Sequence, residues 1–173
     1  MNVIIRQEKL KDINEVYDVV QKAFEDAYYS DHDEHHLVKR LRNSASYVPE
    51  LSLVAECRNR IVGHILFTEI KVGNHTLIAL APVAVLPEMQ SNGIGKLLIM
   101  EGHKIAAQRG YKGSVVMGHD KYYPKFGYKK ANSYGIKAPF DVSDDHFMAV
   151  ELIEGGLTDV HGVVEYAKEF FEN

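Results

Sequence analysis

Two glycines ahead of a helical segment form the most informative pattern in this chain. Gln90, Gly93 and Gly95 have the spacing Q-x-x-G-x-G, directly before apolar residues that recur at helical intervals. Glycine lacks a Cβ, so its backbone adopts unusual dihedral angles and lets a ligand approach closely. The first turn of a helix also presents free backbone N–H groups, which attract anions and phosphate above all. This turn therefore predicts a phosphate-binding site.

The turn does not match two well-known nucleotide-binding patterns. Leu98 stands where the dinucleotide fingerprint requires a third glycine, and the G-x-x-x-x-G-K-S/T sequence of the P-loop is absent. The ligand site is expected to use the residues of the turn and the first helical lysine, which are Gln90, Ser91, Asn92, Gly93, Ile94, Gly95 and Lys96.

A second stretch with chemical potential is Y-Y-P-K-F-G-Y at residues 122–128. Its Lys125 belongs to a basic cluster with Lys121, Lys129 and Lys130, in a chain whose net charge is -4. The cluster is either a solvated surface or a counter-charge for the phosphates of a ligand.

The elements around these residues are expected to be a strand, a turn and a helix. Residues 77–86 are almost wholly apolar, which is typical of a strand covered on both faces. Pro82 cannot donate to a ladder, so we expect this strand to break or bulge there. Gly110 is expected to end the helix, and residues 113–117 form a short buried strand.

The N-terminal half predicts a strand, a helix and a hairpin. Residues 3–5 are a short strand, and Asp12 with Glu15 resembles a capping box that starts the helix. Residues 51–56 and 61–70 are two strands joined by a short polar turn.

The C-terminal third predicts a strand at residues 146–153 and a last helix capped by Thr158. The apolar side chains after Thr158 would give that helix a broad apolar face. This face either packs on the core or contacts a second copy of the chain, so a homodimer is possible.

Composition bounds the class of protein. A chain of 173 residues is most simply one domain, spanning residues 1–173. The net negative charge argues against nucleic acid as a partner, and no apolar run is long enough to span a membrane. Cys57 is the only cysteine, which excludes an internal disulfide and a cysteine-based zinc site. No signal peptide is visible, so we expect a cytoplasmic protein.

Two motifs resemble those of a known superfamily. The Q-x-x-G-x-G turn, preceded by V-A-V-L-P at residues 83–87, resembles the acetyl-CoA motif of the GNAT-type N-acetyltransferases. Residues 122–128 are similar to the Y-x-x-x-G-F/Y element of the same superfamily. Motif order, separation and element order all fit, so the resemblance covers nearly the whole chain. The most similar branch consists of small bacterial proteins described as predicted N-acetyltransferases.

The resemblance implies the acyl-CoA N-acyltransferase fold. This is an α/β (α+β) fold with a mixed, mostly antiparallel sheet of six to seven strands and helices on both faces. Its central parallel pair splays apart and holds the pantetheine arm of the cofactor. At that gap the backbone of Val83, Ala84 and Val85 would bind the amides of the arm like an added strand.

The resemblance also implies an activity, which is acetyl transfer from acetyl-CoA to a primary amine. Tyr123 matches the tyrosine of the superfamily that protonates, or hydrogen-bonds to, the coenzyme A sulfur, and Tyr122 is the neighbour that could substitute. Lys125 would help to neutralise the phosphates of coenzyme A. No Ser-His-Asp or cysteine nucleophile pattern occurs, so direct attack by the amine is favoured over a ping-pong route.

The base that deprotonates the amine is less well marked. An alkyl ammonium must lose a proton before it attacks. Glu69, near the end of the predicted strand at 61–70, and His119, at the end of the predicted strand at 113–117, are both candidates, and a backbone carbonyl with ordered water is an alternative.

Residues 31–36, D-H-D-E-H-H, begin a second short helix. His32 and His36 lie four residues apart, but the order differs from H-E-x-x-H, and we expect no metal site. In the resembled superfamily the first helix pair and its loop lie over the acceptor site, so Tyr28, Tyr29 and Glu34 are candidates to line it, with Tyr29 and Glu34 as the candidate substrate-binding residues. The alternative is a solvated helix start.

A different functional class stays open. The same fold could serve as a non-catalytic acyl-CoA-binding sensor or partner module. For an enzyme, the negative net charge favours a cationic small molecule or a peptide amine as the acceptor.

Overall fold

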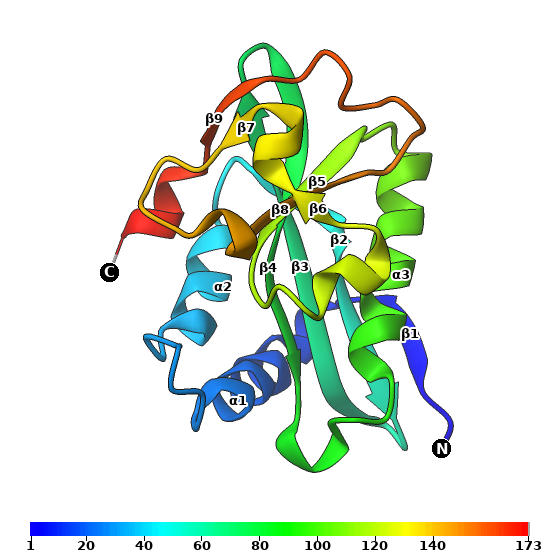
Figure 1. The fold of residues 1–173 in the computed structure, drawn as a ribbon. Coiled ribbons are helices and arrows are strands. Elements are labelled where there is room, and N and C mark those ends of the chain that lie inside the picture. Colours follow the sequence, from blue (N-terminus) through cyan, green and yellow to red (C-terminus); the bar gives the residue numbers. More distant parts are fainter. Residues whose placement is uncertain (173) are drawn as a thin grey trace.

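Residues 1–172, which the computed structural model describes, form a nine-stranded sheet flanked by α-helices (Figure 1). The strands are β1 (Ile4–Gln7), β2 (Tyr47–Cys57), β3 (Arg60–Val72), β4 (His75–Val85), β5 (Gly113–Met117), β6 (Lys129–Lys130), β7 (Ile136–Lys137), β8 (Phe147–Glu151) and β9 (Gly162–Glu165). The α-helices are α1 (Ile13–Phe24), α2 (Glu34–Arg42) and α3 (Ile94–Gln108). Short 3-10 helices are η1 (Leu10–Asp12), η2 (Pro87–Met89), η3 (Tyr123–Phe126), η4 (Ala131–Tyr134), η5 (Asp144–His146) and η6 (Lys168–Phe171).

The sheet is mixed and mostly antiparallel, as expected. Seven strands follow the order β1-β2-β3-β4-β5-β8-β6, with β4 and β5 parallel and the other neighbours antiparallel. Off this path, β9 pairs with β3, and β7 pairs with β9 in parallel. The seven-stranded path confirms the expected fold class, and β7 and β9 add a small extension to it.

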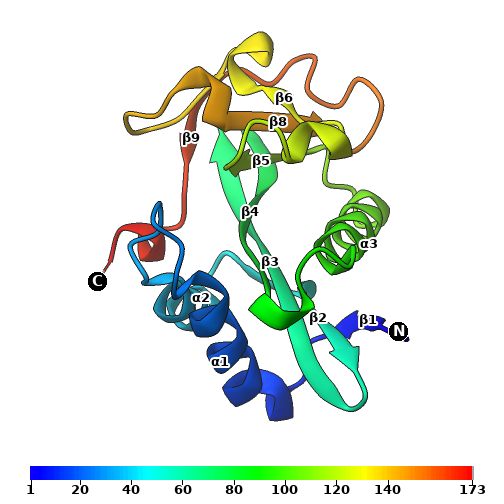
Figure 2. The same ribbon diagram turned by 60° about the horizontal axis from the view of Figure 1, so that its bottom comes forward.

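Helices cover both faces of the sheet (Figure 2). The helices α1 and α2 lie on one face, and α1 buries Val16, Val19 and Val20. The other face carries α3, which comes so close that a Cβ on Gly102 would lie 2.3 Å from the Phe67 ring. The end of α3 is also as expected, because Gly110 follows it with φ +91°.

The central strand β4 bulges at Pro82. In the β3–β4 ladder Ile65 faces Val83 and Phe67 faces Leu80, so Ala81 and Pro82 together oppose Leu66. The parallel pairing of β4 with β5 is confined to Ile78↔Ser114 and Ala79↔Val115. Beyond these pairs the two strands separate, and within residues 1–172 no strand pairs with the second half of β4 on that edge.

The prediction of a last helix after Thr158 was wrong. The segment instead forms β9, which begins at Gly162 with φ +133°, and then η6. Val163 is exposed while Val164 is buried and faces Val72 of β3, an alternation that belongs to a strand. Valines favour strands because branching at Cβ restricts them in a helix. The expected apolar helix face does not exist.

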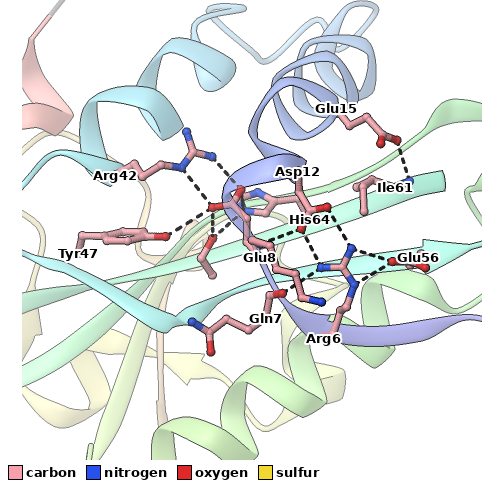
Figure 3. Close-up of polar contacts among 12 residues, drawn as sticks. Arg6, Gln7, Glu8, Asp12, Glu15, Arg42, Tyr47, Glu56, Ile61 and His64 are labelled. Atoms are coloured by element: carbon pink, nitrogen blue, oxygen red, sulfur yellow. Dashed lines mark hydrogen bonds and ion pairs between the residues drawn. The ribbon is translucent and has the colours of Figure 1, made fainter. Parts of the chain in front are cut away.

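The prediction that Asp12 and Glu15 form a capping box at the start of α1 was also wrong, because both side chains make other contacts. The Asp12 carboxylate accepts hydrogen bonds from Lys9 N (2.7 Å) and from both terminal nitrogens of Arg6 (2.7 and 3.0 Å) (Figure 3). Glu15 accepts from Ile61 N (3.0 Å) in the β2–β3 hairpin. Both side chains therefore join α1 to other elements instead of satisfying its own first turn.

A buried polar cluster joins α2 to the sheet (Figure 3). Arg42 donates two hydrogen bonds to the Glu8 carboxylate, at 3.1 and 2.8 Å, and Ser52 Oγ donates a third at 3.2 Å. Ser52 Oγ also lies 3.1 Å from His64 Nε2. His64 is completely buried, and this burial lowers its pKa to about 4.

This histidine predicts a loss of stability in acid. His64 has a folded pKa of about 4 and an unfolded pKa of about 6.5. Between these values the unfolded chain binds a proton that the folded chain does not, so stability is present above pH 6.5 and falls as the pH approaches 4. Urea unfolding across this range should show the loss. His64→Gln should reduce the slope of the free energy of unfolding against pH. His119→Gln, which changes an exposed histidine, is the control and should keep the wild-type slope. Equal slopes in the wild type and both variants would refute the assignment to His64.

Candidate active site

A cavity of about 1940 Å³ opens where β4 and β5 separate. Its walls come from the second half of β4, the turn before α3, the end of β5, η3 and the α1–α2 loop. Of the predicted ligand residues, the cavity is lined by Val83, Val85, Gln90, Ser91, Gly93, Ile94, Gly95, Lys96 and Lys125. The fold thus brings together residues from two motifs that are far apart in the sequence.

Two predicted ligand residues do not line the cavity. The Ala84 side chain is buried in the sheet. The Asn92 side chain donates to the carbonyl oxygens of Met89 and Gln90, each at 3.1 Å, and these hydrogen bonds stabilise the turn. Asn92 therefore shapes the site without facing it.

The two glycines of the turn are needed for different reasons. Gly93 is the N-cap of α3 with φ +79°, and a Cβ there would meet nothing within 4 Å. Its backbone conformation requires glycine, and the space beside it is open to a ligand. At Gly95 a Cβ would lie 2.7 Å from Tyr122 Oη. The first helical bond runs from Leu97 N to Gly93 O, so the intervening N–H groups have no partner within the helix.

The contact at Gly95 predicts a coupled pair of substitutions. Gly95→Ala should destabilise the protein by about 1–3 kcal/mol, because the Tyr122 ring packs on Tyr123 and Phe126 and cannot swing away freely. Adding Tyr122→Phe should restore stability, since the next Tyr122 atom lies 3.9 Å from the new methyl group. Urea unfolding of both single variants and the double variant measures the coupling. Additive effects would contradict the contact.

Tyr123 lies on the cavity wall and is only 9% exposed. Its ring packs edge to face on Tyr122 and Tyr128, with centroids 5.2 and 5.7 Å apart. Gly118, at the end of β5, makes room for it, because a Cβ there would lie 2.4 Å from the ring. Burial raises the pKa of Tyr123 well above its usual value, with smaller contributions from Tyr122 and Tyr29. At neutral pH Tyr123 is therefore a protonated hydrogen-bond donor.

His103 on α3 lines the same cavity and was not among the predicted site residues. Its Nε2 lies 3.0 Å from Tyr128 Oη, which is in turn 2.9 Å from Ser114 Oγ. Burial lowers the pKa of His103 to about 4, so the imidazole is neutral at physiological pH. The helical spacing of the apolar residues in the sequence did not indicate which residues of α3 would reach the cavity.

The two predicted bases have different positions. His119 lines the cavity with its side chain 70% exposed, and its Nδ1 lies 3.4 Å from Asp120 Oδ1. Glu69 does not line the cavity. It faces Ile78, where β4 and β5 are still paired, and its carboxylate accepts a hydrogen bond from Tyr111 Oη (2.6 Å). The structure therefore does not bring Glu69 to Tyr123.

The predicted acceptor residues Tyr29 and Glu34 both line the cavity, opposite the α3 turn. One Glu34 oxygen accepts from the Ser30 hydroxyl, and the other is buried without a partner among the described residues. In the described part of the chain, no group of three or more His, Cys, Asp or Glu side chains is placed to hold a metal ion. None of the helices within residues 1–172 has the length and apolarity needed to cross a membrane.

Comparisons with known proteins agree on one family. The model of the acetyltransferase (GNAT) family matches residues 13–128. The uncharacterized N-acetyltransferase YjhQ of Escherichia coli K12 is 34% identical over 140 residues, which are 78% of this chain and 75% of that protein. The uncharacterized N-acetyltransferase YhbS of the same strain is 27% identical over 123 residues, or 69% and 74% of the two chains.

Two solved structures are similar over nearly the whole chain. A GNAT family acetyltransferase from Brucella melitensis, in complex with acetyl-CoA, has a TM-score of 0.81 and 30% identity, with 98% of each chain covered. The structure of Escherichia coli YhbS in complex with CoA has a TM-score of 0.90 and 24% identity, with 99% of this chain and 93% of that chain covered.

Proposed function

Because the chain belongs to the acetyltransferase (GNAT) family, we propose that it moves an acetyl group from acetyl-CoA to a primary amine by direct attack. The protein is thus an N-acetyltransferase that depends on acetyl-CoA. The observation that carries this proposal is the shared cavity of the Gln90–Lys96 turn, the unpaired edge of β4 and Tyr123. Acetyl-CoA in the Brucella melitensis relative and CoA in YhbS support it.

The donor would be held along two walls of the cavity. The free N–H groups at the start of α3, with Lys96 and Lys125, would bind its phosphates. Val83 and Val85 pair with β3 on one edge of β4, and on the other edge, past the last β5 pair, the amides of the pantetheine arm would add as a strand does. The Gln90 side chain donates to Val85 O (3.1 Å), which supports the proposal because this carbonyl faces the open edge of β4.

Acetyl transfer requires the amine nitrogen to bond to the thioester carbon as the carbon–sulfur bond breaks. The bonding pair then remains on sulfur, and the nitrogen loses a proton as the amide forms. We assign Tyr123 as the hydrogen-bond donor to the coenzyme A sulfur. Its raised pKa lies far above that of a thiol, so the hydroxyl stabilises the leaving thiolate chiefly by donating a hydrogen bond in a buried setting.

His119 is the side chain we assign to the proton of the attacking amine. It lies on the cavity wall and is exposed to solvent, so a proton that it accepts reaches bulk water directly. Glu69 has no part in this proposal because it lies outside the cavity.

The experiment that tests this function measures release of the coenzyme A thiol from acetyl-CoA in the presence of primary amines. We expect release that depends on both enzyme and amine, with an acetylated product of the corresponding mass. Acetyl-CoA binding without any release above the buffer rate, across amines of every charge class, would contradict the enzyme and favour a binding module.

A further inference from the structure

The end of the cavity opposite the α3 turn is built from three segments that are distant in sequence. They are the cavity-lining residues of 24–40, 140–142 and 166–171, which we call the acceptor chamber. Figures 1 and 2 show η6, near the C-terminus, beside α2. Arg40 of α2 donates to the carbonyl oxygen of Glu169 (3.0 Å) and holds the C-terminal segment there.

Aromatic rings dominate the walls of the acceptor chamber. Phe140 stacks on Tyr166 with centroids 5.9 Å apart and planes inclined by 22°, and Tyr166 contacts Phe170 with centroids 4.9 Å apart. On the opposite wall Tyr28 and Tyr29 are 96% and 75% exposed, although their rings contact each other. Large aromatic side chains left open to solvent inside a cavity are typical of a surface that a ligand covers.

The acceptor chamber carries a negative charge on Glu34, whose carboxylate is partly buried. Glu34 Oε1 is buried without a hydrogen-bond partner among the described residues. The one arginine that lines the chamber, Arg40, already pairs with Asp33 at 2.9 Å. A buried carboxylate oxygen without a partner is unfavourable, and a ligand N–H donor with positive charge would satisfy it best.

The acceptor chamber belongs to the same cavity as Tyr123. Tyr29 and Tyr123 line the same cavity, and Tyr29 is near enough to contribute to the raised pKa of Tyr123. Glu34 follows Tyr29 after one short stretch of loop. The acceptor chamber and the Tyr123 wall are therefore two parts of one cavity.

From the aromatic walls and the unpaired Glu34 oxygen we infer the class of acceptor: a small amine joined by a short alkyl chain to an aromatic ring, without a carboxylate. This inference rests on the proposed function. The ring packs among the aromatic walls, and the ammonium group binds Glu34. An amino acid is disfavoured because its carboxylate would meet Glu34 with no unpaired arginine to receive it. A polyamine is expected to be a poorer acceptor because it has no ring to bury against the aromatic walls.

The test compares four acceptors with acetyl-CoA and the intact protein: phenethylamine, phenylalanine, butylamine and spermidine. We expect kcat/KM for phenethylamine to exceed that for butylamine and spermidine by about tenfold or more, and that for phenylalanine by about 100-fold. If any of the other three is the better substrate, the inference is overturned while the proposed function stands. If no amine is acetylated although acetyl-CoA binds, both fail.

Glu34→Gln keeps the shape of the side chain and removes its charge. It should raise KM for phenethylamine by about tenfold or more and leave the affinity for acetyl-CoA unchanged, which also shows that the variant folds. Asp26→Asn removes a charge from the loop between α1 and α2, outside the cavity, and should leave both values unchanged. An unchanged KM in Glu34→Gln, or an equal rise in Asp26→Asn, would remove Glu34 from acceptor binding.

Discussion

Replacing Tyr123 with phenylalanine is expected to lower kcat by about 100-fold, which is the size of the effect when one preorganised donor to a developing anion is lost. The affinity for acetyl-CoA should stay within about twofold, because the hydroxyl acts on charge that develops only as the carbon–sulfur bond breaks. Phenylalanine keeps the packing on Tyr122 and Tyr128, so the fold should be preserved. Initial rates at saturating substrates, with calorimetric titration of acetyl-CoA, measure both quantities.

Tyr122→Phe is the matched control for this prediction. Tyr122 is adjacent in sequence, lines the same cavity, and directs its hydroxyl at Gly95 of the turn. The control should keep most of its turnover. If Tyr123→Phe turns over at the wild-type rate, or if the two variants lose activity equally, Tyr123 is not the donor to sulfur.

Replacing Gly93 with glutamate is expected to weaken acetyl-CoA binding by about 100-fold or more. A side chain at φ +79° adds strain of about 1–2 kcal/mol, and a carboxylate at the start of α3 repels the phosphates that the turn should bind. No atom lies within 4 Å of the added Cβ, so the change should not disturb the core. Calorimetric titration gives the affinity.

Gly110→Glu provides a control at the other end of the same helix. Gly110 also has a positive φ, +91°, and also has open space around its Cβ position. Strain and added charge are therefore similar, but the site lies away from the cavity. The control should bind acetyl-CoA like the wild type. Equal losses in both variants would mean that binding fails through general destabilisation, and full binding by Gly93→Glu would place the phosphates elsewhere.

The strand–turn–helix unit around Gly93 could be predicted from the sequence because its signals are local. A long apolar run, a proline within it and glycines at a helix start each have a physical consequence within a few residues. The bulge at Pro82 follows this expectation, and the separation of β4 from β5 agrees with what the family resemblance implied.

The C-terminal segment could not be predicted in the same way. Its valines fit either a helical or an alternating pattern over so short a stretch. The outcome depends on the free edge of β3, where Val72 receives Val164, and that edge is distant in sequence. Tertiary pairing overrode a local signal that was ambiguous.

The site shows the same division between local and distant information. Tyr123 and the turn were identified from motifs, whereas Glu69 was chosen by its place near a strand end. The strand is present, but pairing keeps Glu69 away from the separated half of β4. His103 and the rings of Phe140, Tyr166 and Phe170 were missed because their places depend on which faces of distant elements meet at one cavity.

The most direct test of the account is a crystal structure of the protein with coenzyme A. We expect the pyrophosphate on the free N–H groups at the start of α3 and the pantetheine arm beside Val83 and Val85. The sulfur should lie within hydrogen-bonding distance of Tyr123 Oη. A sulfur remote from Tyr123, or phosphates bound away from the Gln90–Lys96 turn, would contradict the assignment of this cavity as the acetyl-transfer site.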